Sequence, residues 1–274
     1  MSLQLDSRQR AMLQEMGVRV FGSALPLGLI DDAPPGPPRG GEAAAAAARD
    51  AGLAGLRPAP APYISTAQNH SARALASDVA TMDWPALQSA VASCEACGLC
   101  QNRKNTVFGM GDTQARWLVV GEAPGESEDL QGLPFVGAAG QLLDNMLKAI
   151  GLDRHAKGEK GVFIANVLKC RPPANRNPLP EEIAQCAPYL QRQLELMQPK
   201  IILALGRFAA QALLQASVPD VAQIPLGKLR GQTYRFQDVP VIVSYHPAYL
   251  LRTPHDKAKA WADLCLALAV SQQQ

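Results

Sequence analysis

The spacing of apolar and polar positions changes near residue 83, after which short apolar runs alternate with amphipathic stretches. Such alternation is typical of strands joined by crossover helices. Nearly every position in the short runs is apolar, as expected for strands that are buried on both faces of a parallel sheet. The predicted strands are 117–120, 162–168, 201–205 and 241–245.

The amphipathic stretches between these strands predict helices, and three of them meet helix-ending or helix-starting residues. A helix at 139–150 ends at Gly151, one at 181–197 stops before Pro199, and one at 207–215 follows Gly206. A last helix at 257–270 closes the chain. The sequence therefore predicts an α/β fold with three α/β/α layers around a central, mostly parallel four-stranded sheet.

Three short motifs follow predicted strands directly. GEAPG comes after the first strand, KCRPP after the second and YHPAYLL after the fourth. Ligands of open parallel sheets bind beyond the carboxyl ends of the strands. We therefore expect the three motifs to converge on one crevice.

Residues 1–82 differ in composition from the rest of the chain. Residues 31–63 are rich in Pro, Gly and Ala, and they contain too few large apolar side chains to offset the entropy lost on ordering. We expect a mostly disordered N-terminal extension over 1–82 and a folded domain over 83–274. Within the extension, helical spacing of apolar residues allows either a short docking helix for a protein partner or a frayed terminal helix. These residues are Met12, Leu13, Met16 and Val20.

The charge of the whole chain is nearly balanced, with 26 Lys and Arg against 24 Asp and Glu. Any affinity for nucleic acid must therefore come from a local patch. No apolar stretch approaches the roughly 20 residues of a membrane span, and the polar start of the chain lacks a secretory signal core. We expect a monomer in the cytoplasm, associated with the nucleoid and not with a membrane.

Four of the six cysteines bracket the motifs: Cys94 and Cys97 in CEAC, Cys170 in NVLKCRPP, and Cys186. In a cytoplasmic protein a C-x-x-C pair favours a metal or cluster over disulfides. CEACGLC also offers Cys97 with Cys100 as an overlapping pair, and four cysteines would suit structural zinc as well.

From about Cys94 to the end, the chain resembles the family 4 uracil-DNA glycosylases, the iron-sulfur branch of that superfamily. The resemblance rests on the C-x-x-C pair, GEAPG with the downstream GLPFVGAAGQLL, NVLKCRPP with its later cysteine, and HPAYLLR, all in the family's order. It implies an enzyme that flips uracil out of single- or double-stranded DNA and hydrolyses its N-glycosidic bond, leaving an abasic site. A non-catalytic iron-sulfur adaptor for DNA or a polymerase is the alternative.

The same resemblance implies a structural [4Fe-4S] cluster with four thiolate ligands. Its ligands would be Cys94, Cys97, Cys170 and Cys186. Cys265 lies in an apolar helix and is expected to be a small core residue.

The resemblance also implies roles at the base. Phe135 would stack on uracil, and Asn166 would pair with uracil O4 and N3–H, groups that cytosine presents with the opposite polarity. His246 would donate a hydrogen bond to uracil O2 while negative charge grows there, which makes it the first candidate for a catalytic residue.

The GEAPG loop departs from the best-known branch of the superfamily, because Ala123 replaces an aspartate that positions the attacking water. Glu122 is the nearest carboxylate and is expected to orient water or to hold the loop, while backbone N–H groups at Glu122 and Ala123 could bind a uracil carbonyl. Glu128 is expected to wall the pocket beside uracil C5 against the thymine methyl. Leu250 would wedge into the base stack, and Arg252 would contact phosphates.

Overall fold

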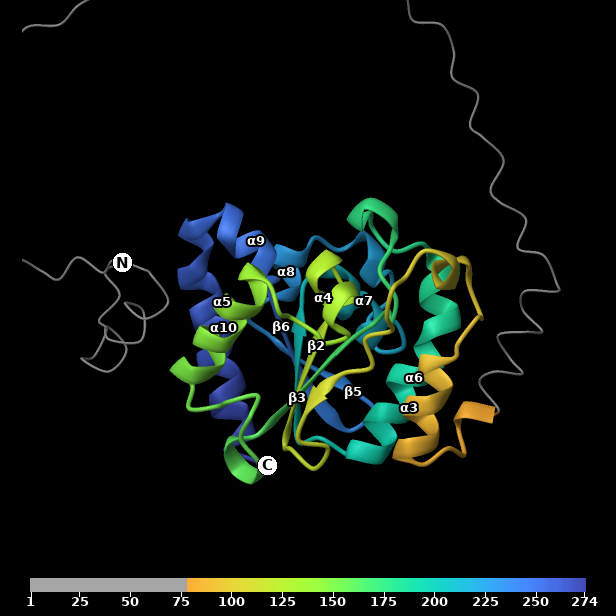
Figure 1. Ribbon diagram of the computed structural model, residues 1–274. Helices are drawn as coiled ribbons and strands as arrows, with labels where there is room; N and C mark the ends of the chain where they lie inside the picture. Colours follow the sequence, from red (N-terminus) through yellow and green to blue (C-terminus); the bar gives the residue numbers. More distant parts are fainter. Residues whose placement is uncertain (1–77) are drawn as a thin grey trace, which may run out of the picture. The chain divides into compact units, whose positions relative to one another are not determined.

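The computed structural model describes residues 78–274, and the predictions for residues 1–77, including the docking helix, lie outside this part. At its centre is a six-stranded sheet with the order β1-β3-β2-β4-β6-β5. The four inner strands run parallel, while β1 and β5 pair antiparallel at the two edges (Figure 1). The strands are β1 Met110–Gly111, β2 Trp117–Gly121, β3 Val162–Asn166, β4 Ile201–Leu205, β5 Thr233–Phe236 and β6 Val239–Ser244.

The predicted α/β class and the four parallel strands are confirmed, but the prediction of a four-stranded sheet is wrong. Both missed strands are edge strands. β1 has only two residues, and β5 leaves alternate residues exposed. An edge strand of this kind needs no continuous apolar run, so the pattern that reveals the inner strands is missing from it.

Helices cover both faces of the sheet. The helices α5, α9 and α10 pack on one face, while α3, α6 and α7 pack on the other (Figure 1). All four helices predicted from the sequence are present, with ends that agree to within one residue. Among the described residues, no helix is long and apolar enough to cross a membrane. The helices are α3 Trp84–Ala92, α4 Glu126–Gln131, α5 Ala138–Ala149, α6 Pro180–Met197, α7 Arg207–Leu214, α8 Leu226–Leu229, α9 Pro247–Arg252 and α10 Lys257–Ser271.

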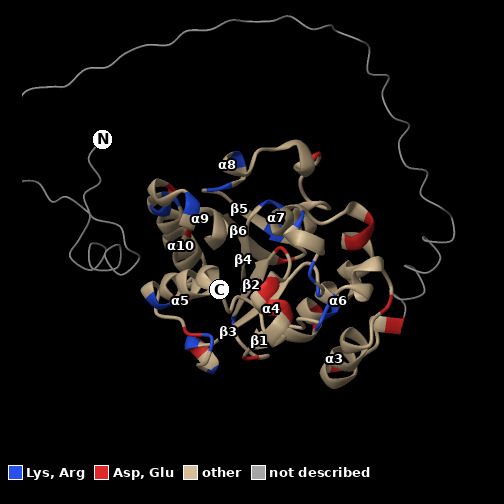
Figure 2. Ribbon diagram, turned by 45° about the horizontal axis from the view of Figure 1, so that its top comes forward, with Lys and Arg blue, Asp and Glu red and all other residues tan. Residues whose placement is uncertain are grey.

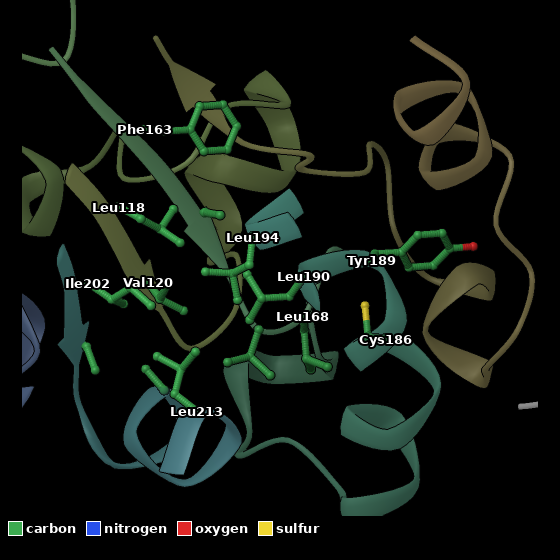
Figure 3. Packing of buried hydrophobic residues seen from close by; sticks show 14 of the residues in the cluster. Leu118, Val120, Phe163, Leu168, Cys186, Tyr189, Leu190, Leu194, Ile202 and Leu213 are labelled. Carbon is green, nitrogen blue, oxygen red and sulfur yellow. The ribbon is translucent and has the colours of Figure 1, made fainter. Parts of the chain in front are cut away.

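The inner strands are buried on both faces because successive side chains point to opposite sides of the sheet. On one face, Leu118 and Ile202 pack with Leu190 of α6 (Figure 3). On the other, Val119 packs in a cluster that includes Leu143 of α5. This double burial explains the nearly continuous apolar runs, and it gives the loops at the carboxyl ends of the strands a rigid base.

Candidate active site

A pocket of about 750 Å³ opens at the carboxyl ends of the four parallel strands. Glu122 follows β2, Asn166 ends β3, Gly206 follows β4 and His246 follows β6, and all four line the pocket. The chain passes from β2 to β3 on one side, and the next connection crosses from β3 to β4 on the other side of β2. Such a switch point is where open α/β sheets bind ligands. The expected convergence of the motifs on one crevice is therefore present.

Asn166 presents an unpaired acceptor to this pocket. Asn166 is 2 % exposed, and its Oδ1 has no hydrogen-bond partner within residues 78–274. Burying a polar atom without a partner is unfavourable, and a ligand N–H group in the pocket would satisfy it. The amide is therefore suited to reading the edge of a planar, hydrogen-bonding ligand.

Gly121 allows two motif side chains to meet at the floor of the pocket. A Cβ atom at this position would lie 2.4 Å from Asn166 Oδ1 and 2.6 Å from Phe135 Cζ. Both separations are far below an ordinary contact between such atoms. Only glycine leaves room here for the amide and the phenyl ring together.

Phe135 lines the pocket with a largely buried ring and a backbone φ of 53°. This left-handed conformation is rare for a bulky residue other than glycine. The phenyl ring stacks against the imidazole of His246, with centroids 5.4 Å apart and planes inclined by 26°. A flat apolar surface and a hydrogen-bonding ring therefore lie side by side in the pocket.

His246 is fixed by capping α9. Its Nδ1 accepts a hydrogen bond of 3.2 Å from the backbone N–H of Ala248, and Pro247 occupies the first helical position. An accepting Nδ1 places the proton of a neutral imidazole on Nε2. Burial lowers the pKa of His246 to about 4; the nearby Glu128 carboxylate opposes this shift and Arg252 adds to it. At neutral pH the ring is therefore an uncharged Nε2–H donor.

Glu122 is a half-buried carboxylate on the pocket wall. Burial raises the pKa of Glu122, while the positive charge of Arg207 opposes the shift. Arg207 also lines the pocket, as the first residue of α7. Arg207 was not among the residues expected from the sequence, although its position directly beyond the end of β4 was a usable signal.

Glu128 connects the two loops that carry the first motif. Its carboxylate accepts hydrogen bonds from Gly125 N at 3.1 Å and from Val136 N at 3.0 Å. The side chain lines the pocket, and so does Ala123. The contact expected between Glu128 and the C5 edge of uracil stays a prediction. The hydrogen bonds show that Glu128 joins the two loops.

The two adjacent leucines of α9 differ in exposure, and the wedge role expected of Leu250 stays a prediction. Leu250 is 0 % exposed and packs in the core beneath the pocket, whereas Leu251 is 44 % exposed. A side chain can enter a base stack only from the surface, and Leu251 is the leucine of α9 that lies there. Arg252 lines the pocket, and its expected contact with phosphates stays a prediction.

Basic residues lie on α7, α8 and α9, and acidic residues gather on α4 (Figure 2). Further pocket-lining residues were not identified from the sequence. They include Asn175, Arg176, Tyr245 and Tyr249. Asn175 and Arg176 belong to the polar stretch after KCRPP, which carried no recognisable pattern.

A separate small cavity is lined by four cysteines. They are Cys94, Cys97, Cys170 and Cys186, and Cys186 projects from α6 beside Tyr189 (Figure 3). Burial raises the pKa of Cys170 to about 11 and that of Cys186 to about 12, so both are neutral thiols unless a cation compensates the charge.

Two donors point at these sulfur atoms. Arg103 Nη1 donates to Cys170 Sγ, and the backbone N–H of Lys169 donates to Cys186 Sγ, both at 3.2 Å. In the part of the chain from residue 78 onward, no three His, Cys, Asp or Glu side chains are grouped closely enough to hold a single metal ion. Four cysteine side chains line this one cavity, and iron-sulfur clusters are held by four Cys thiolates, so the chemistry of the donor set fits such a cluster.

Comparisons with known proteins agree with this geometry. Residues 108–265 match the uracil DNA glycosylase superfamily. The type-4 uracil-DNA glycosylase of Archaeoglobus fulgidus is 46% identical over 168 residues, which cover 60% of this chain and 81% of the relative. The type-4 enzyme of Pyrobaculum aerophilum is 41% identical over 189 residues, which cover 68% of this chain and 93% of the relative. A type-5 uracil-DNA glycosylase of Pyrobaculum aerophilum is 33% identical over 150 residues, which cover 51% of this chain and 64% of the relative.

Proposed function

The chain belongs to the type-4 uracil-DNA glycosylases and removes uracil from DNA, and we propose that it does so in the pocket at the carboxyl ends of β2, β3, β4 and β6. The observation that carries this proposal is the buried, unpaired Oδ1 of Asn166. Membership of a glycosylase family makes the chain a DNA repair hydrolase, in place of the adaptor considered from the sequence. The base must leave the duplex before it can enter such a pocket.

Recognition of uracil would rest on Asn166 and Phe135. The Asn166 Oδ1 would accept the N3–H of uracil, and its amide nitrogen would donate to O4. Cytosine offers an acceptor at N3 and a donor at N4, so the same amide would be mispaired, which is costly in a buried site. The Phe135 ring would stack on the base.

His246 would lower the barrier to departure of the base. Its neutral imidazole, with the proton held on Nε2, would donate to uracil O2 as negative charge grows there. One such preorganised donor stabilises a transition state by about 2.7 to 4 kcal/mol. The low pKa supports a donor that keeps its own proton throughout.

Glu122 would orient the water that attacks the sugar as the base leaves. Burial raises the pKa of Glu122, and the positive charge of Arg207 opposes this shift and so favours the ionised carboxylate, the form that accepts a hydrogen bond from water. If the base departs largely before the water attacks, the demand on this carboxylate as a base is modest. The backbone at Ala123 forms the adjacent wall.

The rim of the pocket would hold the DNA around the flipped nucleotide. Arg252 and Arg207 would contact phosphates, so binding would weaken as salt rises. Leu251, the exposed leucine of α9, would fill the gap in the base stack in place of Leu250.

Type-4 enzymes typically carry a [4Fe-4S] cluster, and Cys94, Cys97, Cys170 and Cys186 are the residues here that would hold it. Their convergence on one cavity that Cys100 does not line supports this set over one with Cys100. When bound, the cluster would supply a structural cross-link. It would tie the segment before β1 to the loop after β3 and to α6, and so steady the end of β3 that carries Asn166.

A direct assay tests the proposal. Purified protein, incubated with single- or double-stranded oligonucleotides that contain one uracil, should release free uracil without magnesium. The backbone should stay intact until alkali cleaves it at the abasic site. DNA binding without release of uracil, in protein whose iron content is full, would contradict the proposal.

A further inference from the structure

Arg154 lies outside all the motifs, yet its guanidinium is buried beneath the loop that carries Phe135. The residue is 6 % exposed. Its Nη1 donates to the carbonyl of Pro134 at 3.1 Å and to that of Phe135 at 2.9 Å, while Nη2 donates to the carbonyl of Gly140 at 3.4 Å. Its Nε forms an ion pair with Asp144 of α5. One rigid group thus holds three backbone carbonyls.

The backbone that Arg154 holds is a strained one. Phe135 has a φ of 53°, a conformation that persists in a bulky residue only where its surroundings impose it. The loop also lies very close to α5, since a Cβ atom on Gly140 would lie 1.8 Å from the Phe135 carbonyl oxygen. On the other side of the same peptide, the Val136 N–H donates a hydrogen bond to the Glu128 carboxylate. Arg154 supplies the matching constraint on the carbonyl side.

The position of the Phe135 ring depends on this constraint. The ring reaches Gly121 at the pocket floor and stacks against His246 at 5.4 Å, so a change in backbone angle at Phe135 would move it away from both. We propose that Arg154 is a positioning residue that fixes the Phe135 ring in the orientation in which it stacks on the flipped uracil. This inference rests on the proposed stacking role of Phe135.

An arginine suits this position better than a lysine. The planar guanidinium has five N–H donors in a fixed fork, so it can bond the carbonyls and the Asp144 carboxylate at once. A lysine ammonium is a compact point charge and would satisfy only some of these acceptors. Asp144 itself is partly exposed and touches the guanidinium edge that faces away from Phe135, so its loss should matter less.

A double-mutant cycle on kcat/KM tests the inference with Arg154→Met, Phe135→Ala and the double variant. Loss of one base-stacking contact corresponds to about a tenfold change, so Arg154→Met should lower kcat/KM about tenfold in the natural background. In the Phe135→Ala background the same change should cost less than about twofold, because residues that act as one unit are not additive. Arg154→Lys should lie in between.

Two further measurements separate positioning from a general loss of structure. Arg154→Met should weaken inhibition by free uracil while leaving affinity for undamaged DNA unchanged. Arg192→Met is the matched control, because Arg192 bonds a carbonyl far from the pocket, that of Met82. If Arg154→Met does not fold, Arg154→Lys carries the same cycle.

The outcomes distinguish the inference from the proposal on which it rests. Equal losses from Arg154→Met in both backgrounds would overturn the inference, since Arg154 would then act independently of Phe135. Wild-type kcat/KM in Phe135→Ala alone would overturn the stacking role itself. A loss in Phe135→Ala together with non-additivity in the cycle supports both.

Discussion

The imidazole of His246 lies stacked against the phenyl ring of Phe135, with 5.4 Å between the ring centroids. The two residues come from loops after different strands, yet they form one continuous wall of the pocket. A base that stacks on Phe135 would therefore lie beside the Nε2–H donor of His246. Recognition of the base and stabilisation of the leaving group share a single rigid surface.

Replacing His246 with alanine tests the hydrogen-bond donor. Loss of one such donor typically lowers kcat by about 10²- to 10³-fold. DNA affinity, measured by fluorescence anisotropy, should change little because the phosphate contacts remain. His255→Ala is the control, since that side chain is 79% exposed and lies outside the pocket. Equal losses of binding and turnover in His246→Ala would instead indicate a folding role.

The pH dependence of kcat/KM should distinguish the titration of Glu122 from that of His246. The pKa of His246 is lowered to about 4, so its neutral donor form persists until the pH falls that far. Burial raises the pKa of Glu122, so its ionised form is lost first as the pH falls. The acid limb of kcat/KM should therefore follow Glu122. Glu122→Gln should be slower and should lack this limb, and an unchanged limb would exclude Glu122 as its source.

Asn166→Asp should alter the choice of base. An ionised carboxylate has no donor for uracil O4, but it can accept a hydrogen bond from the N4 amino group of cytosine. We expect uracil excision to fall by about 5- to 150-fold, since one mispaired buried polar group costs about 1 to 3 kcal/mol. The ratio of cytosine to uracil excision, measured on matched oligonucleotides, should rise. An unchanged ratio would mean that Asn166 does not read the base.

Gly121→Ala should block the pocket from its floor. The added Cβ atom would lie 2.4 Å from Asn166 Oδ1 and 2.6 Å from Phe135 Cζ, so both side chains would have to move. Uracil excision should fall sharply, whereas affinity for undamaged DNA should be retained. Gly98→Ala is the matched control, because a Cβ atom there meets nothing within 4 Å. Full activity of Gly121→Ala would contradict the assigned pocket floor.

The proposed cluster ligands can be tested one at a time. Cys170→Ser should lower the iron content and the visible absorption of the purified protein and reduce its melting temperature, because a cluster needs its four thiolates. Cys100→Ser should leave all three unchanged, since Cys100 does not line the cysteine cavity. Iron loss in Cys100→Ser with retention in Cys94→Ser would reverse the assignment of the first pair.

Much of the fold could be predicted because burial leaves a direct pattern in the sequence. β2, β3 and β4 are buried at every position, so each appears as a nearly continuous apolar run, which in β3 ends at Asn166. β5 could not be found this way, since its alternate side chains are exposed. The predicted site residues Asn166, Phe135 and His246 were recognisable from motifs, and all three line the same pocket.

The sequence by itself determined the parallel strands, their helices and the motifs at the strand ends, since these depend on local spacing and on residue type. Only the tertiary structure decided which leucine of α9 faces solvent, because adjacent residues of a helix point in different directions. Leu250 packs in the core, and Leu251 is exposed. It also revealed Arg207 beside Glu122 and Arg154 beneath Phe135. Such contacts join segments that are separated in the chain, and their geometry follows from how the loops pack on the sheet.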